Sequence, residues 1–221
     1  AAKTMADTFE GNTDGCHLYS RHTTPSNLCL GEALAAMEGT ETANVSASGM
    51  GAITPVLLQL CGAGDHIVSS RTIYGGTYAF LKNFTPRLAI QTSFVDITNL
   101  EIVEASITEN TKVLYCESVS NPLLEVADIK GLAALAKKHT LTLVVDNTFS
   151  PLSISPIQLG ADVVVHSLTK FINGSSDAVG GVVCGSQEFI DQLRSVIDGA
   201  CMLLGSTMDS LRASSILKNL R

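Results

Sequence analysis

The stretch Asp162-Val163-Val164-Val165-His166-Ser167-Leu168-Thr169-Lys170-Phe171 decides the fold of this chain. Its three consecutive valines predict a strand that is buried on both faces, as is typical of a parallel sheet between helices. The strand ends near Ser167, and Lys170 follows three residues later. Taken alone, a lysine in such a place is usually a surface residue on a loop. A lysine just beyond a buried strand is also well placed for amine chemistry on a carbonyl group.

A second apolar run, Leu141 to Val145, precedes this stretch and ends in Asp146. Between the two runs, the sequence SPIQLG at 155–160 predicts one helical turn, with serine as its cap, proline at its start and glycine past its end. A strand–crossover–strand unit of this length makes the two strands parallel neighbours. Asp146 and Lys170 are therefore expected at the same carboxyl edge of the sheet, where doubly wound α/β proteins bind ligands.

A lysine and a carboxylate at one sheet edge suit pyridoxal 5'-phosphate (PLP). The lysine amine can hold the aldehyde as a Schiff base, and the carboxylate can keep the pyridine nitrogen protonated. Asp146 also has a simpler interpretation, since an aspartate after a strand is often a turn former or a helix cap. The two strand ends together favour the cofactor interpretation.

The composition narrows the class of protein. The chain has 221 residues, 45% of them hydrophobic and 16% charged, with a formal net charge of −7. This acidic balance argues against binding of nucleic acid or of a membrane surface, and no apolar run is long enough for a membrane span. The six cysteines include no CxxC pair, which indicates reduced residues in a cytoplasmic protein. His17 and His22 lie in a segment of loop-like composition, so no metal site is predicted.

Strands and helices alternate along the rest of the chain without an internal domain boundary. This alternation predicts a three-layer α/β fold, in which a mostly parallel sheet lies between helices. The strands are expected at 43–48, 66–69, 89–95, 112–116, 141–148, 163–165 and 179–184. The helices are expected at 26–38, 53–60, 78–84, 99–107, 129–139, 187–198 and 208–220.

Glycines mark one strand-to-helix turn, Ser48-Gly49-Met50-Gly51-Ala52. Backbone amides at such a turn can face outward, and a helix start attracts anions, so the turn is a candidate phosphate cradle; an ordinary tight turn is the alternative. Neither GxGxxG nor GxxxxGK[ST] occurs, which argues against a Rossmann-like nucleotide binder. Tyr74, at another strand end, can offer a flat face to an aromatic ligand or simply pack at the rim of the domain.

Six short motifs occur in order between residues 19 and 170 and together resemble the Cys/Met-metabolism family of PLP-dependent enzymes. This family includes cystathionine γ-lyase, cystathionine γ-synthase, methionine γ-lyase and O-acetylhomoserine sulfhydrylase. The resemblance implies the large domain of an aspartate-aminotransferase-like PLP enzyme. The motifs are Tyr19-Ser20-Arg21, Ser48-Gly49-Met50, Tyr74-Gly75-Gly76-Thr77, Asn121-Pro122, Asp146-Asn147-Thr148-Phe149 and Ser167-Leu168-Thr169-Lys170.

The resemblance also implies a role for individual residues. Lys170 would be the Schiff-base lysine and would carry protons between substrate carbons. Tyr74 would stack on the cofactor ring and act as a general acid near the leaving group, and Asp146 would pair with the pyridine nitrogen. Asn121 would contact the phenolic oxygen of the ring. The cofactor-binding set implied in this way is Tyr19, Arg21, Ser48, Gly49, Met50, Tyr74, Asn121, Asp146, Ser167, Thr169 and Lys170, in which the amides of Gly49 and Met50 and the hydroxyls of Ser167 and Thr169 hold the phosphate.

Oligomer and domain organisation follow from the same resemblance. Tyr19 and Arg21 would reach the phosphate of a neighbouring subunit's cofactor, so the active site would be shared across a dimer, within a homotetramer. Residues 1–25 would then be an arm and 26–221 the PLP-binding large domain. Members of the family continue into a smaller C-terminal domain, which supplies the arginine for the substrate carboxylate. That domain is expected to be absent from this chain.

The implied reaction is γ-elimination or γ-replacement on a sulfur amino acid or an activated homoserine. The motif Ser48-Gly49-Met50 favours a C–S lyase of the cystathionine or methionine γ-lyase type. The loop Tyr74-Gly75-Gly76 lacks the cysteine typical of methionine γ-lyases, so O-acetylhomoserine sulfhydrylase and cystathionine γ-synthase stay open as alternatives. A further alternative is a truncated chain that binds the cofactor without activity of its own.

Overall fold

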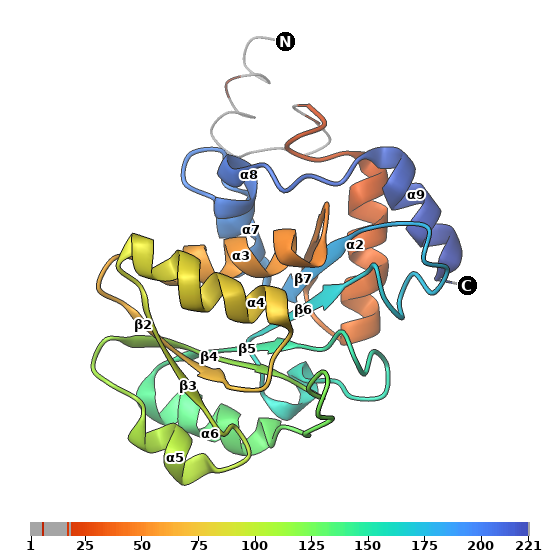
Figure 1. The fold of residues 1–221 in the computed structure, drawn as a ribbon. Coiled ribbons are helices and arrows are strands. Elements are labelled where there is room, and N and C mark those ends of the chain that lie inside the picture. Colours follow the sequence, from red (N-terminus) through yellow and green to blue (C-terminus); the bar gives the residue numbers. More distant parts are fainter. Residues whose placement is uncertain (1–5, 7–16, 18, 221) are drawn as a thin grey trace.

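Seven strands form one sheet in the computed structural model, which describes residues 6, 17 and 19–220 (Figure 1). The order across the sheet is β1-β7-β6-β5-β4-β2-β3. The neighbours from β6 to β3 pair in parallel, and β7 is antiparallel to both β6 and β1. The predicted, mostly parallel sheet is thus confirmed. The strands are β1 (Thr42–Ser46), β2 (His66–Ser70), β3 (Gln91–Val95), β4 (Thr111–Glu117), β5 (Thr142–Asp146), β6 (Val163–Ser167) and β7 (Gly181–Gly185).

Helices cover both faces of this sheet and enclose two apolar clusters, one on each face (Figure 1). One face carries α2 (Pro25–Glu38), α5 (Leu100–Ala105), α6 (Ile129–His139) and α9 (Ser210–Asn219). The opposite face carries α3 (Gly49–Leu60), α4 (Gly75–Ala79), α7 (Gln187–Arg194) and α8 (Ala200–Leu204). This arrangement confirms the three-layer α/β fold. Among the described residues, no helix is long and apolar enough to cross a membrane.

The unit formed by β5 and β6 has the predicted parallel geometry. Asp146 on β5 lies opposite Val165 on β6, so both strands end at the same edge of the sheet. The connection contains the short 3-10 turn η3 (Ile157–Leu159), which ends at Gly160 in the left-handed conformation, as the sequence predicts. The serine cap was predicted wrongly, because the Ser155 hydroxyl donates a hydrogen bond to the carbonyl of Glu38 at 3.2 Å instead.

Helices α2 and α3 begin earlier than predicted, as does α4, which begins at Gly75. Thr24 caps α2, with its side chain accepting from the N–H of Asn27, because Pro25 suits the first helical position. Ser48 caps α3 in the same way through the N–H of Gly51. The glycines that suggested a loop before residue 53 are therefore part of the first helical turn.

The C-terminal helices also differ from prediction. The helix predicted over 187–198 ends at Arg194 as α7, and α8 begins beyond that range, at Ala200, and was not predicted. The Ser195 hydroxyl accepts from the N–H of Ile197 at 3.3 Å, which gives the backbone a turn in place of a further helical bond. After α4, the chain continues through the π-helical turn η1 (Phe80–Phe84) and the 3-10 turn η2 (Thr85–Leu88).

Candidate active site

A pocket of about 840 Å³ lies at the carboxyl edge of the parallel strands. Its wall joins the ends of β4, β5 and β6 to the beginnings of α3 and α4. Segments that are far apart in the sequence thus meet where doubly wound sheets bind ligands. Nine of the eleven predicted cofactor-binding residues line it, namely Ser48, Gly49, Met50, Tyr74, Asn121, Asp146, Ser167, Thr169 and Lys170.

Lys170 lies in the turn that follows β6. Leu168 is fully buried and anchors this turn in the core, while the N–H of Gly174 donates to the carbonyl of Lys170 at 2.9 Å. The Lys170 side chain is exposed at the pocket, and no carboxylate of the described residues lies within ion-pair distance of its amine. The amine is therefore accessible to a carbonyl compound in the pocket.

Asp146 places a buried carboxylate in the wall of the same pocket. The residue is 5% exposed, and its carboxylate accepts hydrogen bonds from the N–H of Thr148 at 2.9 Å and from the hydroxyl of Tyr115 at 3.4 Å. Burial raises the pKa of Asp146, against the hydrogen bonds from Thr148 and the charge of His166, which lower it. A buried carboxylate of this kind favours a cationic partner. A protonated pyridine nitrogen in the pocket meets that requirement.

Glu117 is a pocket residue that the sequence analysis missed. Its two carboxylate oxygens accept from the N–H of Tyr74 at 2.6 Å and from the N–H of Asn121 at 2.9 Å. Burial, and then the charge of Asp146, raises the pKa of Glu117 to about 7. Its position at the end of a buried strand is the signal that pointed to Asp146, and the same argument would have found Glu117.

Tyr74 is fixed through its backbone N–H, which donates to Glu117, and its ring is exposed at the pocket. The residue precedes α4, and its side chain is 48% exposed at the pocket. A Cβ atom on Gly76 would lie 2.5 Å from Cε1 of this ring, so the ring can occupy its place only because residue 76 is glycine. A flat side chain on a fixed backbone is suited to covering an aromatic ligand.

The first turn of α3 approaches Ser167 at the end of β6. A Cβ atom on Gly49 would lie 2.7 Å from Cβ of Ser167, so only glycine permits this approach. Ser48 uses its side chain to cap the N–H of Gly51, and the N–H groups of Gly49 and Met50 lie at the open end of the helix. Helix N–H groups beside a serine hydroxyl form a donor set that fits a phosphate group.

Thr169 lies at the pocket with its hydroxyl already engaged. The hydroxyl donates to the carbonyl of Gly180 at 3.2 Å and accepts from the N–H of the same residue at 3.1 Å. Thr169 therefore ties the turn that carries Lys170 to the segment just before β7.

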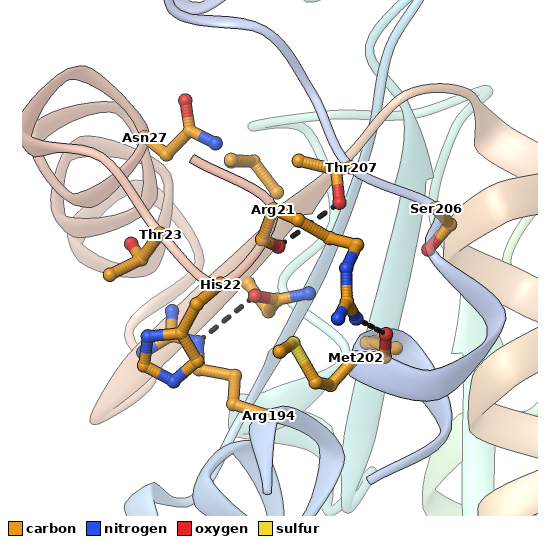
Figure 2. Close-up of a pocket in the computed structure, with 11 residues that line it drawn as sticks. Arg21, His22, Thr23, Asn27, Arg194, Met202, Ser206 and Thr207 are labelled. Carbon is orange, nitrogen blue, oxygen red and sulfur yellow. Dashed lines mark hydrogen bonds between the residues drawn. The ribbon is translucent and has the colours of Figure 1, made fainter. Parts of the chain in front are cut away.

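Tyr19 and Arg21 lie outside the Lys170 pocket and beside each other. Figure 2 shows Arg21 directed toward α8, where its guanidinium donates to the carbonyl of Met202 at 2.6 Å. The carbonyl of Arg21 accepts from the hydroxyl of Thr207 at 3.1 Å, and the ring of Tyr19 lies 5.0 Å from the guanidinium carbon. The structure thus does not bring these two residues to the pocket of their own chain. Their predicted contact with a neighbouring subunit stays a prediction.

All 221 residues match the family model described as Cys/Met metabolism PLP-dependent enzyme. The chain belongs to this family. The predicted family and its cofactor, PLP, are thereby confirmed. Within residues 6, 17 and 19–220, no group of three or more histidine, cysteine, aspartate or glutamate residues could hold a metal ion.

The proteins that this chain is similar to include lyases and a sulfhydrylase. The chain is 50% identical over 202 residues to methionine gamma-lyase of Arabidopsis thaliana, covering 90% of this chain and 46% of that protein. It is 40% identical over 222 residues to O-succinylhomoserine sulfhydrylase of Pseudomonas aeruginosa, covering 99% and 54%. The crystal structure of cystathionine gamma-lyase from Lactobacillus plantarum in complex with L-serine superposes with a TM-score of 0.86 at 31% identity, covering 91% and 52%. The chain thus spans about half the length of the relatives it matches.

Proposed function

We propose that this chain forms the PLP-binding part of an enzyme for γ-elimination or γ-replacement on sulfur amino acids or activated homoserine. Within this range we favour a C–S lyase of the cystathionine or methionine γ-lyase type. The observation that carries the proposal is the single pocket shared by Lys170, Asp146 and the first turn of α3. The identity of 50% to methionine gamma-lyase of Arabidopsis thaliana supports the lyase.

The proposed chemistry divides between the cofactor and the pocket residues. PLP supplies an electron sink for the negative charge that forms at the substrate α-carbon. Lys170 anchors the cofactor, and its amine moves a proton between adjacent carbons of the substrate. Asp146 keeps a proton on the ring nitrogen, because its buried carboxylate needs a cationic partner.

The remaining pocket residues bind the cofactor and orient it. Tyr74 covers the ring and donates a proton to the leaving group, and Asn121 contacts the phenolic oxygen. The phosphate is held by the amides of Gly49 and Met50 and by the hydroxyl of Ser167. Ser48 and Thr169 complete this cradle; their hydrogen bonds to Gly51 and Gly180 keep its walls in place.

The proposed assembly is a homotetramer built from dimers that share active sites. Residues 1–25 act as an arm that brings Tyr19 and Arg21 to the neighbouring subunit, and residues 26–221 form the large domain. In support, neither Tyr19 nor Arg21 lines the pocket of its own chain. The proposed location is the cytoplasm, because the five cysteines among the described residues are free, as in a reducing compartment.

Two alternatives concern the reaction itself. The identity of 40% to O-succinylhomoserine sulfhydrylase of Pseudomonas aeruginosa favours a C–S bond-forming enzyme, such as a sulfhydrylase or cystathionine γ-synthase. The other alternative is a chain that binds PLP without turnover of its own. Product analysis separates the three: a 2-oxo acid with ammonia for the lyase, a new thiol or thioether amino acid for replacement, and no product for the inactive chain.

The test of the site is an absorption spectrum of the purified protein with PLP, before and after borohydride, followed by peptide mass mapping. We expect a yellow protein whose visible band is lost on reduction, with the pyridoxyl mass on Lys170. A protein that takes up no PLP, or a pyridoxyl mass on another lysine, would contradict the proposal.

A further inference from the structure

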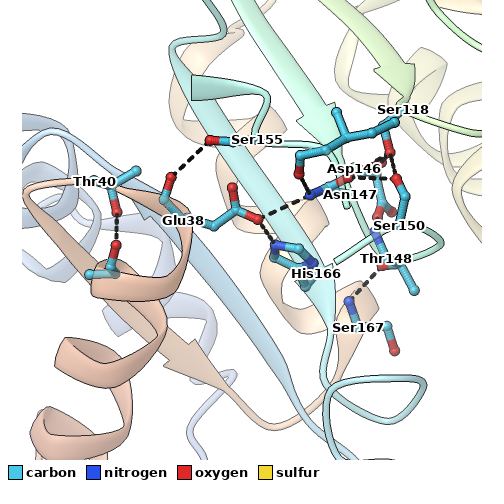
Figure 3. Close-up of polar contacts among 12 residues, drawn as sticks. Glu38, Thr40, Ser118, Asp146, Asn147, Thr148, Ser150, Ser155, His166 and Ser167 are labelled. Atoms are coloured by element: carbon cyan, nitrogen blue, oxygen red, sulfur yellow. Dashed lines mark hydrogen bonds and ion pairs between the residues drawn. The ribbon is translucent and has the colours of Figure 1, made fainter. Parts of the chain in front are cut away.

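The last residue of α2, Glu38, lies buried on the face of the sheet opposite to the Lys170 pocket. The residue is 6% exposed, and its Oε1 atom lies 2.6 Å from Nε2 of His166 and 3.1 Å from Nδ2 of Asn147 (Figure 3). A carboxylate only accepts hydrogen bonds, so Nε2 of His166 carries a proton in this contact. One carboxylate oxygen thus joins α2 to the ends of β5 and β6.

Both partners of Glu38 are adjacent in the sequence to pocket residues. Asn147 follows Asp146, and His166 precedes Ser167. Because successive side chains along a strand point to opposite faces, Asp146 and Ser167 face the pocket while their neighbours face α2. A contact made on the α2 face therefore fixes backbone that also carries the pocket residues.

Both polar atoms of the Asn147 side chain have hydrogen-bond partners. Its Oδ1 atom accepts from the hydroxyls of Ser118 at 2.7 Å and Ser150 at 2.9 Å, and its Nδ2 atom donates to Glu38 and to the carbonyl of Ile154 at 2.9 Å. A side-chain amide with both atoms engaged fixes the turn in which it lies. This turn is the one that orients Asp146.

Hydrogen bonds then connect the turn to both pocket residues. The N–H of Thr148 donates to the carboxylate of Asp146 at 2.9 Å, and the hydroxyl of Thr148 accepts from the N–H of Ser167 at 2.8 Å (Figure 3). A displacement of Asn147 would therefore move the carboxylate of Asp146 and the end of β6 together.

We propose that Glu38 is a positioning residue for the cofactor: by holding Asn147 and His166 on the α2 face, it sets Asp146 toward the ring nitrogen and Ser167 toward the phosphate. A buried contact between a carboxylate and an imidazole is weak support for a role in stability alone. The proposal rests on the proposed function of the pocket. The proposal goes beyond that function because it assigns a role to a residue that does not line the pocket.

The variants separate hydrogen bonding from charge. Glu38→Gln keeps an oxygen that can accept from both partners. The amide nitrogen of the glutamine would take the place of Oε2 of Glu38, which has no hydrogen-bond partner among the described residues. Glu38→Asp keeps the charge but is one methylene too short to reach both. Glu38→Ala removes the contact. Glu32→Gln, on the exposed face of the same helix, is the matched control.

The measurements are the PLP dissociation constant, the absorption spectrum of bound PLP and the melting temperature of each variant. We expect Glu38→Ala and Glu38→Asp to weaken PLP binding by roughly tenfold or more, and to shift the spectrum, while Glu38→Gln and Glu32→Gln stay within about threefold of the unmodified protein. If the alanine variant does not fold, the aspartate and glutamine variants decide by the same criterion. A lower melting temperature with an unchanged dissociation constant and spectrum would overturn the proposal. If the unmodified protein itself binds no PLP, the proposed function fails instead.

Discussion

Glu117 and Asp146 lie opposite each other on β4 and β5, and both carboxylates line the pocket that contains Lys170. Glu117 connects the N–H groups of Tyr74 and Asn121, whereas Asp146 accepts from the N–H of Thr148 and the hydroxyl of Tyr115 and faces the pocket. Two neighbouring acids in one buried site therefore have different tasks. Glu117 fixes the backbone of the pocket wall, and Asp146 faces the ligand.

The shifted pKa of Glu117 predicts how stability depends on pH. Its pKa of about 7 in the fold lies above the ordinary value of 4.5, so the folded cofactor-free protein binds this proton more tightly than the unfolded chain. The stabilising contribution of this proton is full below pH 4.5 and is lost as the pH rises through about 7. We expect Glu117→Gln to remove this loss, which amounts to at most about 3 kcal/mol in the free energy of unfolding.

Urea denaturation of the cofactor-free protein at several pH values measures this effect. Glu109→Gln, at an exposed position, serves as the control and is expected to retain the pH dependence of the unmodified protein. Equal slopes of unfolding free energy against pH in Glu117→Gln and the unmodified protein would contradict the assignment.

Replacing Asp146 tests the pairing with the ring nitrogen. Asp146→Asn keeps the shape of the side chain and removes its charge, so the ring would lose the group that keeps it protonated. We expect a fall in kcat of roughly 100-fold to 1000-fold, the usual effect of removing one preorganised electrostatic contact. Release of ammonia and 2-oxo acid provides the assay, and Asp191→Asn on the surface of α7 is the control. An Asp146→Asn enzyme as fast as that control would argue against the role.

The parts of the site that the sequence predicts are those set by strand ends. The valine runs and the short crossover place Asp146 and the turn of Lys170 at one edge, and the register of β5 and β6 agrees. Local signals of this kind need only the pattern of the chain itself. They also explain why the mostly parallel sheet was predictable from the alternation of elements.

The parts that were missed depend on contacts between distant segments. Glu38 stands at a helix end, where a charged residue is usually solvated, and its partners Asn147 and His166 lie 109 and 128 residues away. The start of α3 at Gly49 was missed because glycine disfavours helix interiors, although the first turn tolerates it when Ser48 supplies a cap. Tertiary contacts, more than local propensity, decided these positions.

The close approach of α3 to β6 predicts a steric effect at Gly49. In Gly49→Ala, the added Cβ would meet Cβ of Ser167 at 2.7 Å, so the helix must move away from the end of β6. We expect a loss of stability of about 1–3 kcal/mol, the usual range for overpacking, together with weaker binding of PLP. Gly62→Ala is the matched control, because the nearest atom its added Cβ would meet is 3.8 Å away. Calorimetry and a PLP titration of both variants give the comparison, and equal behaviour would show that the helix start can yield without affecting the cradle.

A shared active site predicts that two inactive variants restore each other. Lys170→Ala removes the anchor from a chain's own pocket, and Arg21→Ala removes the residue proposed to reach the neighbouring pocket. In a dimer of one chain of each kind, one pocket lacks both residues and the other has both. Random exchange makes about half of the dimers mixed, so the mixture should recover about one quarter of the unmodified activity. Each variant is first unfolded and refolded alone, as a control, and is expected to stay inactive. If the refolded mixture shows no more activity than the two separate variants, Arg21 acts within its own chain or not at all.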